Sequence, residues 1–224
     1  MRMRKKKHLD ERLGAIGDIL YICDSEDRNF NTASEIKEYL NFDEWFFKKQ
    51  PLYLEIGCGK GKFAVEYAKN HPEINLLAVE KDGNVIVAAC EAAIEAGVGN
   101  LKFMKCSAEY LPKFIPEKSV ERIFLNFSCP FPKKSYASHR LTHNSFLNRY
   151  KLLMADGAEI HQKTDNMHFF EFSIEQLSQS GFSIKNLTLD LHNSGFEGNI
   201  ITEYEQRFLS LGQPIYRLEA YLAK

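Results

Sequence analysis

A chain of 224 residues, 44% hydrophobic and 26% charged, is long enough to bury a full core, which excludes a miniprotein held together by disulfides. The formal net charge of −1 excludes a protein that coats nucleic acid by general basicity, although a local basic patch stays open. Five cysteines without a C-x-x-C pair, no secretory signal and no long apolar run predict a cytoplasmic protein without a disulfide framework, zinc knuckle or membrane anchor.

The first 50 residues differ from the rest of the chain. They comprise a basic start, the polar stretch "DSEDRNFNTASE" and the aromatic cluster "FDEWFF". We expect residues 1–50 to form a basic N-terminal arm and preamble, and residues 51–224 to form the main domain. The basic start is read either as a solvated end or as an arm that contacts phosphate.

From Pro51 onward, apolar runs of strand length alternate with segments of helical period. This alternation predicts an α/β fold with a doubly wound, mostly parallel sheet, and ligands beyond the carboxyl ends of the strands. The last two strand-like runs, "FSIKNLTLDL" and "PIYRLEAYLA", have no long crossover helix between them and are expected to pair antiparallel. The predicted strands are 52–56, 74–79, 101–105, 120–127 and 157–164, and the predicted helices are 61–70, 83–96, 107–114, 144–154 and 167–180.

A glycine-rich turn follows the first predicted strand of the main domain. In "EIGCGKGKF", Gly57, Gly59 and Gly61 let the backbone bend tightly and approach a ligand. The preceding Glu55 would repel a pyrophosphate but suits an ammonium group. Glu80 ends the next strand, where a carboxylate can accept both hydroxyls of a ribose. These residues together predict a site for S-adenosylmethionine.

Other reactive side chains do not form a recognisable motif. His139 and His143 lie four residues apart but lack the glutamate of a zinc-protease motif, so no metal site is expected. Cys58 lies inside the glycine turn and Cys90 within an apolar helical segment, and both are expected to fill space, since a free cysteine usually packs as a small hydrophobic residue.

Five motifs together resemble the bacterial tRNA (guanine-N7-)-methyltransferase family: "LEIGCGKGKF", "AVEKD", "LNFSCPFPKKSYASHRLT", "KTDN" and "EGNIITEYEQRF". The resemblance covers nearly the whole chain. It implies a class I S-adenosylmethionine-dependent methyltransferase fold, with Glu55 and Glu80 binding the cofactor. An aspartate that touches the adenine end in the family corresponds here to Ser107.

The resemblance also assigns residues to the substrate. The family's Asp-Pro-Trp-Pro-Lys loop corresponds to residues 129–133, so its catalytic, cofactor-side aspartate is replaced by Cys129, while its lysine is kept as Lys133. Phe131 is a candidate stacking surface, and Arg140 is expected to contact phosphate. The residues implied in tRNA binding are Lys133, Asp165, Thr202, Glu203, Tyr204 and Glu205.

The implied function is methyl transfer to N7 of a guanosine in the variable loop of tRNA, with S-adenosylmethionine as cofactor and tRNA as partner. Replacement of the aspartate by Cys129 is expected to slow the reaction but not abolish it, because N7 carries a lone pair and no proton. The protein is expected to be a monomer or a homodimer.

Three alternatives stay open at this point. Cys129 permits a pyrimidine C5 methyltransferase with a cysteine nucleophile, although Pro130 follows the cysteine where such enzymes commonly have a preceding proline. "CPFP" partly echoes the Pro-aromatic clamp of amino-methyltransferases. Ser107 and Cys129 are also compatible with a noncatalytic tRNA-binding relative, whereas the intact cofactor motif argues against it.

Overall fold

The structure is a computed structural model that describes residues 6–23 and 36–222, except for the side chain of Glu203. The chain divides into two compact units, Met1–Ile115 and Pro116–Lys224, called the first and second units below. Within the described ranges, no helix is long and apolar enough to cross a membrane.

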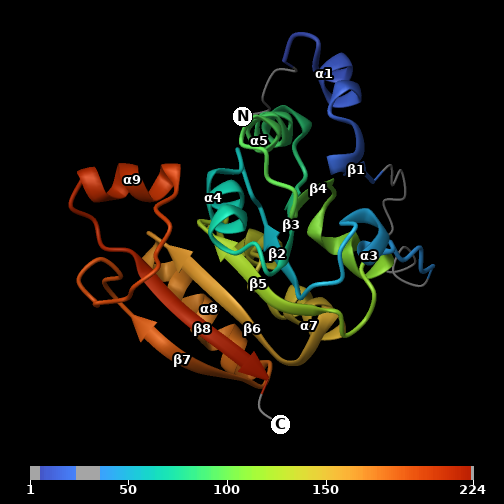
Figure 1. Ribbon diagram of the computed structural model, residues 1–224. Helices are drawn as coiled ribbons and strands as arrows, with labels where there is room; N and C mark the ends of the chain where they lie inside the picture. The colour runs from blue at the N-terminus through green and yellow to red at the C-terminus, as the bar shows by residue number, and fades with distance from the viewer. Residues whose placement is uncertain (1–5, 24–35, 223–224) are drawn as a thin grey trace. The chain divides into compact units, whose positions relative to one another are not determined.

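The first unit contains four parallel strands in the order β1-β4-β3-β2 (Figure 1). The side chains of β2, β3 and β4 are mostly buried, those of β1 are half-buried, and Leu54, Leu76 and Phe103 have no exposed surface. Near-continuous apolar runs of this kind are typical of parallel strands covered on both faces. The strands are β1 (Leu20–Ile22), β2 (Leu52–Ile56), β3 (Asn75–Glu80) and β4 (Leu101–Lys105).

Two amphipathic helices, α4 (Lys62–Asn70) and α5 (Gly83–Glu95), pack on β3 and β4, and helix α1 (Leu9–Ala15) packs on α5. Helix α5 begins after Asp82, whose side chain accepts a hydrogen bond from the backbone N–H of Asn84 at 2.8 Å. The helices of this unit are α1 (Leu9–Ala15), which packs on α5, α3 (Phe42–Trp45), α4 (Lys62–Asn70), α5 (Gly83–Glu95) and α6 (Leu111–Phe114), with 3₁₀ turns η1 (Gly17–Ile19) and η2 (Ala108–Tyr110).

The segment 1–50 contributes more to the fold than its sequence suggested. Strand β1 pairs with β4 and extends the sheet, and the ring of Tyr21 contacts the rings of Trp45 and Phe114. The Trp45 indole donates a hydrogen bond to the carbonyl of Asp18 at 2.6 Å. The first five residues of the basic start and the polar stretch 24–35 lie outside the described residues.

The second unit contains four strands in the order β5-β6-β8-β7 (Figure 1). Strands β5 and β6 are parallel, whereas β8 runs antiparallel to both β6 and β7. The predicted antiparallel pairing at the end of the chain is therefore confirmed. The strands are β5 (Val120–Asn126), β6 (Met154–Thr164), β7 (Phe182–Thr188) and β8 (Tyr216–Leu222).

Helix α8 packs on β6, β7, β8 and α7. The buried hydroxyl of Ser173 on α8 bonds with the Thr142 hydroxyl at 2.8 Å and accepts from the Gln162 Nε2 of β6 at 2.9 Å, which ties the helix to the sheet. Asn166 caps α8 by accepting the N–H of Phe169 at 2.8 Å. The helices of this unit are α7 (Asn144–Leu153), α8 (Met167–Gln179) and α9 (Glu203–Ser210), with the 3₁₀ segment η3 (Lys134–His139).

Candidate active site

The glycine turn of the first unit joins the end of β2 to α4. The backbone N–H groups of Gly57 and Cys58 donate to the carbonyl of Val79 at 2.8 and 3.0 Å, which fixes the turn against the end of β3. Gly57 and Gly59 have φ values of 84° and 59°, in the left-handed region that favours glycine. A Cβ added at either position would meet no heavy atom within 4 Å, so the turn presents bare backbone to open space.

Gly61 has a different reason to be glycine. It precedes α4, and a Cβ at this position would lie 2.7 Å from the Cβ and 3.1 Å from the Cα of Ala89 on α5. The missing side chain therefore allows α4 to approach α5 closely. Gly57 and Gly59 leave room for a ligand, whereas Gly61 holds the turn and the helix in place.

The two predicted cofactor-binding carboxylates lie around this turn. Glu55 is buried near the end of β2, and one carboxylate oxygen of Glu80 accepts the N–H of Asp82 at 3.0 Å, which orients it at the end of β3. Both carboxylates act on the thiol of Cys58. Its pKa is raised well above the usual value, first by burial and then by the negative charges of Glu55 and Glu80. Both carboxylates therefore act on the same thiol and share one neighbourhood.

Ser107 is the second residue after β4 and immediately precedes η2. Its hydroxyl donates to the carboxylate of Glu109. The neighbouring Cys106 N–H donates to the carbonyl of Glu80 at 3.2 Å, which brings the ends of β3 and β4 together. The predicted cofactor residues of the first unit therefore lie at the carboxyl ends of three adjacent parallel strands, where open α/β sheets bind ligands.

These residues fit S-adenosylmethionine. Bare backbone at Gly57 and Gly59 leaves space for a close ligand, and the two carboxylates offer acceptors for an ammonium group and for ribose hydroxyls. A dinucleotide fits less well, since two acidic side chains beside the turn would repel its pyrophosphate.

In the second unit, the loop that carries Cys129 begins at the end of β5. Phe127 and Phe131 have φ values of 50° and 41°, so the backbone turns sharply on both sides of Cys129. Arg140 holds this loop, donating hydrogen bonds to the carbonyls of Pro130 and Phe131 at 2.9 and 3.0 Å. The Arg140 guanidinium also lies 4.4 Å from the ring centre of Phe172. Arg140 therefore supports the loop from within, and its expected contact with phosphate stays a prediction.

The side chains at the tip of this loop are accessible. Cys129 and Lys133 are exposed, and Phe131 is half-buried with its ring 5.7 Å from that of His139. Lys133 precedes η3. An exposed thiol and an exposed ammonium group on a braced loop can both meet a large polar substrate.

Asp165 lies between β6 and α8, at the carboxyl end of its strand. It is half-buried, and burial raises the pKa of its carboxyl group. The adjoining Asn166 N–H donates to the Thr164 hydroxyl at 3.2 Å and fixes the turn that carries Asp165.

The predicted tRNA-binding segment 202–205 forms the start of α9. Thr202 and Glu205 make a reciprocal capping box, with the Glu205 N–H donating to the Thr202 hydroxyl at 3.0 Å. Both side chains are buried, whereas Tyr204 is 60% exposed. The backbone of Glu203 opens the helix, and its side chain lies outside the described residues. Tyr204 is thus accessible to a ligand, and Thr202 and Glu205 serve the helix start.

Lys163 of β6 connects this segment to the sheet. Its buried ammonium group donates to Asn199 Oδ1 at 2.9 Å, to the carbonyl of Ile200 at 2.8 Å and to Glu205 Oε2 at 2.8 Å. The Glu205 carboxylate is fully buried, and its other oxygen accepts from Asn199 Nδ2 at 2.6 Å. Lys163 was not singled out from the sequence, although it belongs to the "KTDN" motif. The sequence signal for Lys163 was its spacing of two and four residues from His161 and Glu159, which places polar side chains at alternate positions of β6.

An aromatic stack joins α9 to the end of β5. The ring of Phe127 lies nearly parallel to those of Tyr204 and Phe208, with ring centres 6.4 and 6.2 Å away. Lys163 Nζ lies 6.0 Å from the ring centre of Phe127. Tyr204, Phe127 and the loop of Cys129 are therefore parts of one connected arrangement in the second unit.

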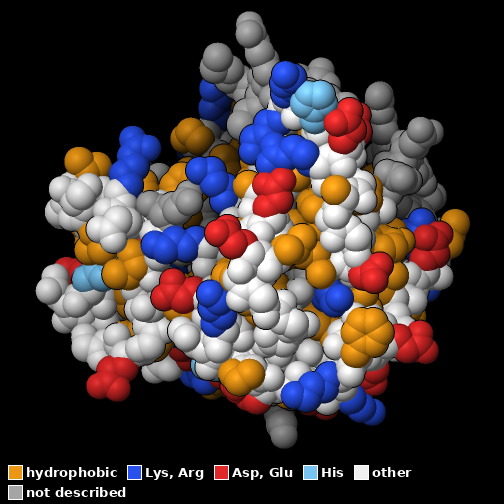
Figure 2. Space-filling view, turned by 45° about the horizontal axis from the view of Figure 1, so that its top comes forward, with side chains coloured by type: hydrophobic (Ala, Val, Ile, Leu, Met, Phe, Trp, Pro, Cys, Tyr) orange, Lys and Arg blue, Asp and Glu red, His pale blue; other side chains and the backbone are white. Residues whose placement is uncertain are grey.

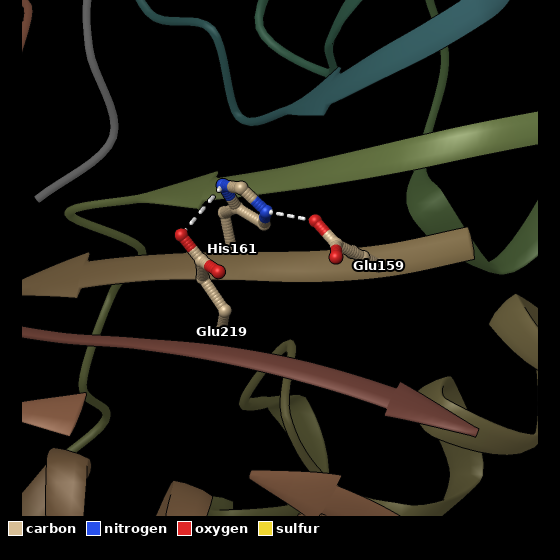
Figure 3. Close-up of side chains that lie close together, drawn as sticks. All are labelled: Glu159, His161 and Glu219. Atoms are coloured by element: carbon tan, nitrogen blue, oxygen red, sulfur yellow. Dashed lines mark hydrogen bonds and ion pairs between the residues drawn. The ribbon is translucent and has the colours of Figure 1, made fainter. Parts of the chain in front are cut away.

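A separate group of charges lies on β6 and β8 (Figure 3). His161 Nε2 is 2.8 Å from a carboxylate oxygen of Glu159, and its Nδ1 is 3.9 Å from one of Glu219. One ligand atom from each residue falls within 4.8 Å of the others, a spacing that would suit a metal ion. However, Lys185 and Arg217 already pair with Glu159 and Glu219 respectively. The group is best explained as an internal ion network.

The surface carries mixed charge. Figure 2 shows Lys and Arg side chains interspersed with Asp and Glu side chains on the face it presents, rather than one continuous basic patch. Mixed charge on this face agrees with the net charge of −1.

Comparisons with known proteins agree with this geometry. Residues 49–218 match the family described as "Putative methyltransferase". A tRNA (guanine-N(7)-)-methyltransferase from Geobacillus kaustophilus (strain HTA426) is 46% identical over 177 residues, which are 79% of this chain and 82% of that protein.

Solved structures of other methyltransferases are similar in fold. An antibiotic-related methyltransferase is 16% identical with a TM-score of 0.58, covering 89% of this chain and 97% of that chain. The 16S rRNA methyltransferase KamB is 15% identical with a TM-score of 0.57, covering 90% and 96%. A 16S rRNA adenine methyltransferase variant from Catenulisporales acidiphilia, solved with cosubstrate SAM, is 13% identical with a TM-score of 0.55, covering 90% and 93%. The predicted methyltransferase fold class is confirmed.

Proposed function

The chain belongs to the tRNA (guanine-N7-)-methyltransferase family, and on this premise we propose that it transfers the methyl group of S-adenosylmethionine to N7 of a guanosine in the variable loop of tRNA. The observation that carries the proposal is the open glycine turn at Gly57 and Gly59 with the carboxylates of Glu55 and Glu80 beside it. A protein that only bound RNA would have no use for this arrangement.

The first unit holds the cofactor. Glu55 receives its ammonium group, and Glu80, already oriented by the N–H of Asp82, accepts its ribose hydroxyls. The backbone at Gly57 and Gly59 lies against it without Cβ atoms in the way. Ser107 lies near the adenine end, where its hydroxyl offers a weaker acceptor than the aspartate of the family. When bound, S-adenosylmethionine supplies an electrophilic methyl group on its sulfonium.

The target base needs alignment more than acid–base chemistry. Guanine N7 has a lone pair and no proton, so no residue has to act as a base before the methyl transfer. Positive charge develops on the purine as it is methylated, and negative or dipolar groups nearby stabilise it. Cys129 occupies the loop position of the family's aspartate, and a cysteine side chain supplies this field less well than a carboxylate. Asp165, which follows β6, the strand paired with β5, is the candidate to supply the negative charge instead.

The remaining residues of the second unit bind the tRNA. Lys133 is exposed and contacts phosphate, and the exposed ring of Tyr204 offers a stacking surface. Thr202 and Glu205 act indirectly, because both are buried and build the start of α9. We assign Lys163 the role of a positioning residue that ties this segment to β6. Glu203 keeps its expected substrate-binding role as part of the same segment.

We further propose the domain division that the sequence predicted: residues 1–50 form a basic arm and residues 51–224 form the methyltransferase domain. Strand β1 belongs to the arm and joins the sheet of the first unit. The family match over residues 49–218 supports this division. A cytoplasmic location is favoured by five cysteines that all remain free thiols. A monomer or a homodimer remains the prediction for the assembly.

The test is to incubate purified protein with labelled S-adenosylmethionine and unmodified tRNA and then to analyse the nucleosides of the digested RNA. The proposal predicts label in N7-methylguanosine, and a Glu80→Ala variant should bind S-adenosylhomocysteine at least tenfold more weakly. Label in another nucleoside would reassign the target base. No label, with cofactor and tRNA binding verified separately, would point to a noncatalytic relative.

A further inference from the structure

Two cysteines occupy paired positions at the edge of the first unit. Strands β1 and β4 are parallel, and their last registered pair is Ile22 with Lys105. Cys23 and Cys106 are the next residues on the two strands, and the Cys23 N–H continues the ladder by donating to the carbonyl of Lys105 at 3.1 Å. Neighbouring strands lie about 4.8 Å apart, inside the range of about 4.4 to 6.8 Å between Cα atoms that a disulfide spans.

The two side chains also contact each other. A hydrogen bond with Cys23, followed by burial, raises the pKa of the Cys106 thiol. Cys106 is buried, and its Sγ lies 3.3 Å from the carbonyl oxygen of Ser107, to which it donates. Cys23 is half-buried and is the partner that solvent reaches.

We propose that Cys23 and Cys106 form a redox-active dithiol that a peroxide converts into an intrachain disulfide joining the carboxyl ends of β1 and β4. The proposal rests on the strand register and on the contact between the two thiols. Neither cysteine belongs to the glycine turn or to the Cys129 loop, so this is a modification site separate from the residues assigned to methyl transfer.

The chemistry balances with hydrogen peroxide as the oxidant. The Cys23 sulfur attacks one peroxide oxygen, the O–O bond breaks, and Cys23 becomes a sulfenic acid as one water leaves. The Cys106 sulfur then attacks the sulfenic sulfur, the S–S bond forms and the S–O bond breaks. The departing hydroxide takes the Cys106 proton and leaves as a second water. Two thiols are oxidised, one peroxide is reduced, and a dithiol reductant reverses the change.

The tether has a consequence for the cofactor site, and this consequence rests on the proposed function. To bond with Cys23, the Cys106 sulfur must leave the carbonyl of Ser107. The Cys106 N–H is also bonded to the carbonyl of Glu80, so movement at Cys106 reaches two of the expected cofactor-binding positions. The disulfide should therefore weaken cofactor binding by about threefold or more.

The test uses the full chain, a small molar excess of hydrogen peroxide, and peptide mapping without reduction. The expected result is a linked peptide pair containing Cys23 and Cys106, two hydrogen masses lighter than the sum of the separate peptides, which dithiothreitol separates again. A Cys23→Ser variant should give no linked pair, whereas Cys90→Ser, which removes a buried thiol elsewhere, should keep it. Absence of the pair in the unaltered protein overturns the proposal.

Calorimetric titration with S-adenosylhomocysteine separates this inference from the proposed function. The reduced protein should bind it, the oxidised protein should bind more weakly, and peroxide-treated Cys23→Ser should match the reduced protein. An unchanged Kd with the linked pair present would contradict the effect on the cofactor site. If the reduced protein fails to bind S-adenosylhomocysteine, the result counts against the proposed function. Peptide mapping would still test whether Cys23 and Cys106 form a disulfide.

Discussion

Replacing Lys163 by methionine should destabilise the protein strongly, because it removes one partner of a fully buried ion pair. The ammonium group makes three hydrogen bonds of 2.8 to 2.9 Å, one of them to the buried carboxylate of Glu205. Methionine fills similar volume but leaves that carboxylate without its cation. Losing one member of a buried pair costs about 3 to 5 kcal/mol. For a chain of this size, this corresponds to a fall in Tm of about 6 to 20 °C.

The assay is urea unfolding followed by circular dichroism, with Lys133→Met as the matched control. Lys133 is exposed in the Cys129 loop, so its replacement should leave stability within about 0.5 kcal/mol of the unaltered protein. The double variant Lys163→Met, Glu205→Gln removes the buried charge and should regain at least about 1 kcal/mol over Lys163→Met.

Kinetics should separate the two lysine variants from each other. Lys163→Met is expected to raise the KM for tRNA and to keep S-adenosylhomocysteine binding, since Lys163 holds the 199–205 segment in place. Lys133→Met should raise the KM for tRNA with unchanged stability. If Lys163→Met lowers the free energy of unfolding by less than about 1 kcal/mol, or if the double variant recovers no stability, the reasoning about the buried pair is refuted.

Three further predictions follow from the same structure. Gly61→Val should weaken S-adenosylhomocysteine binding and lower the Tm, because its Cβ would meet α5 at 2.7 Å, whereas Gly14→Ala, with open space around it in α1, should leave binding unchanged and should not lower the Tm. Burial lowers the pKa of His161 to about 4, so the unfolded chain takes up this proton first and stability is lost as pH falls from about 6.5 to 4. His161→Gln should flatten that window in pH-dependent unfolding, and the exposed His168→Gln should not. Cys129→Asp should raise the single-turnover rate of methyl transfer, and an unchanged rate would show that the loop charge is immaterial.

Local patterns predicted most of the secondary structure. The predicted strands 52–56 and 101–105 coincide with β2 and β4. Short apolar runs bounded by turn residues are typical of the buried strands of a parallel sheet, so this pattern identifies them locally. The glycine turn was also predictable, since its spacing and its position after a strand are local features. Strand β1 was missed because three residues carry no periodicity, and only pairing with β4 makes them a strand.

The candidate site was predictable only in part, because some roles depend on distant partners. Lys163 and Glu205 lie 42 residues apart in sequence, and only the folded chain shows that their charges meet. Arg140 was expected to contact phosphate, and nothing in the sequence indicated that its guanidinium also donates to the carbonyls of Pro130 and Phe131. Residue type indicated which groups carry charge, and the fold decided which of them remain available to a substrate.

The most direct test of the central claim is atom-specific. Two transcripts of the same tRNA, one with guanosine and one with 7-deazaguanosine throughout, are incubated with the protein and labelled S-adenosylmethionine. Methyl transfer to N7 predicts label in the guanosine transcript alone, because the deaza base has no N7 lone pair. Equal labelling of both transcripts would contradict the account and place the methyl group on another atom.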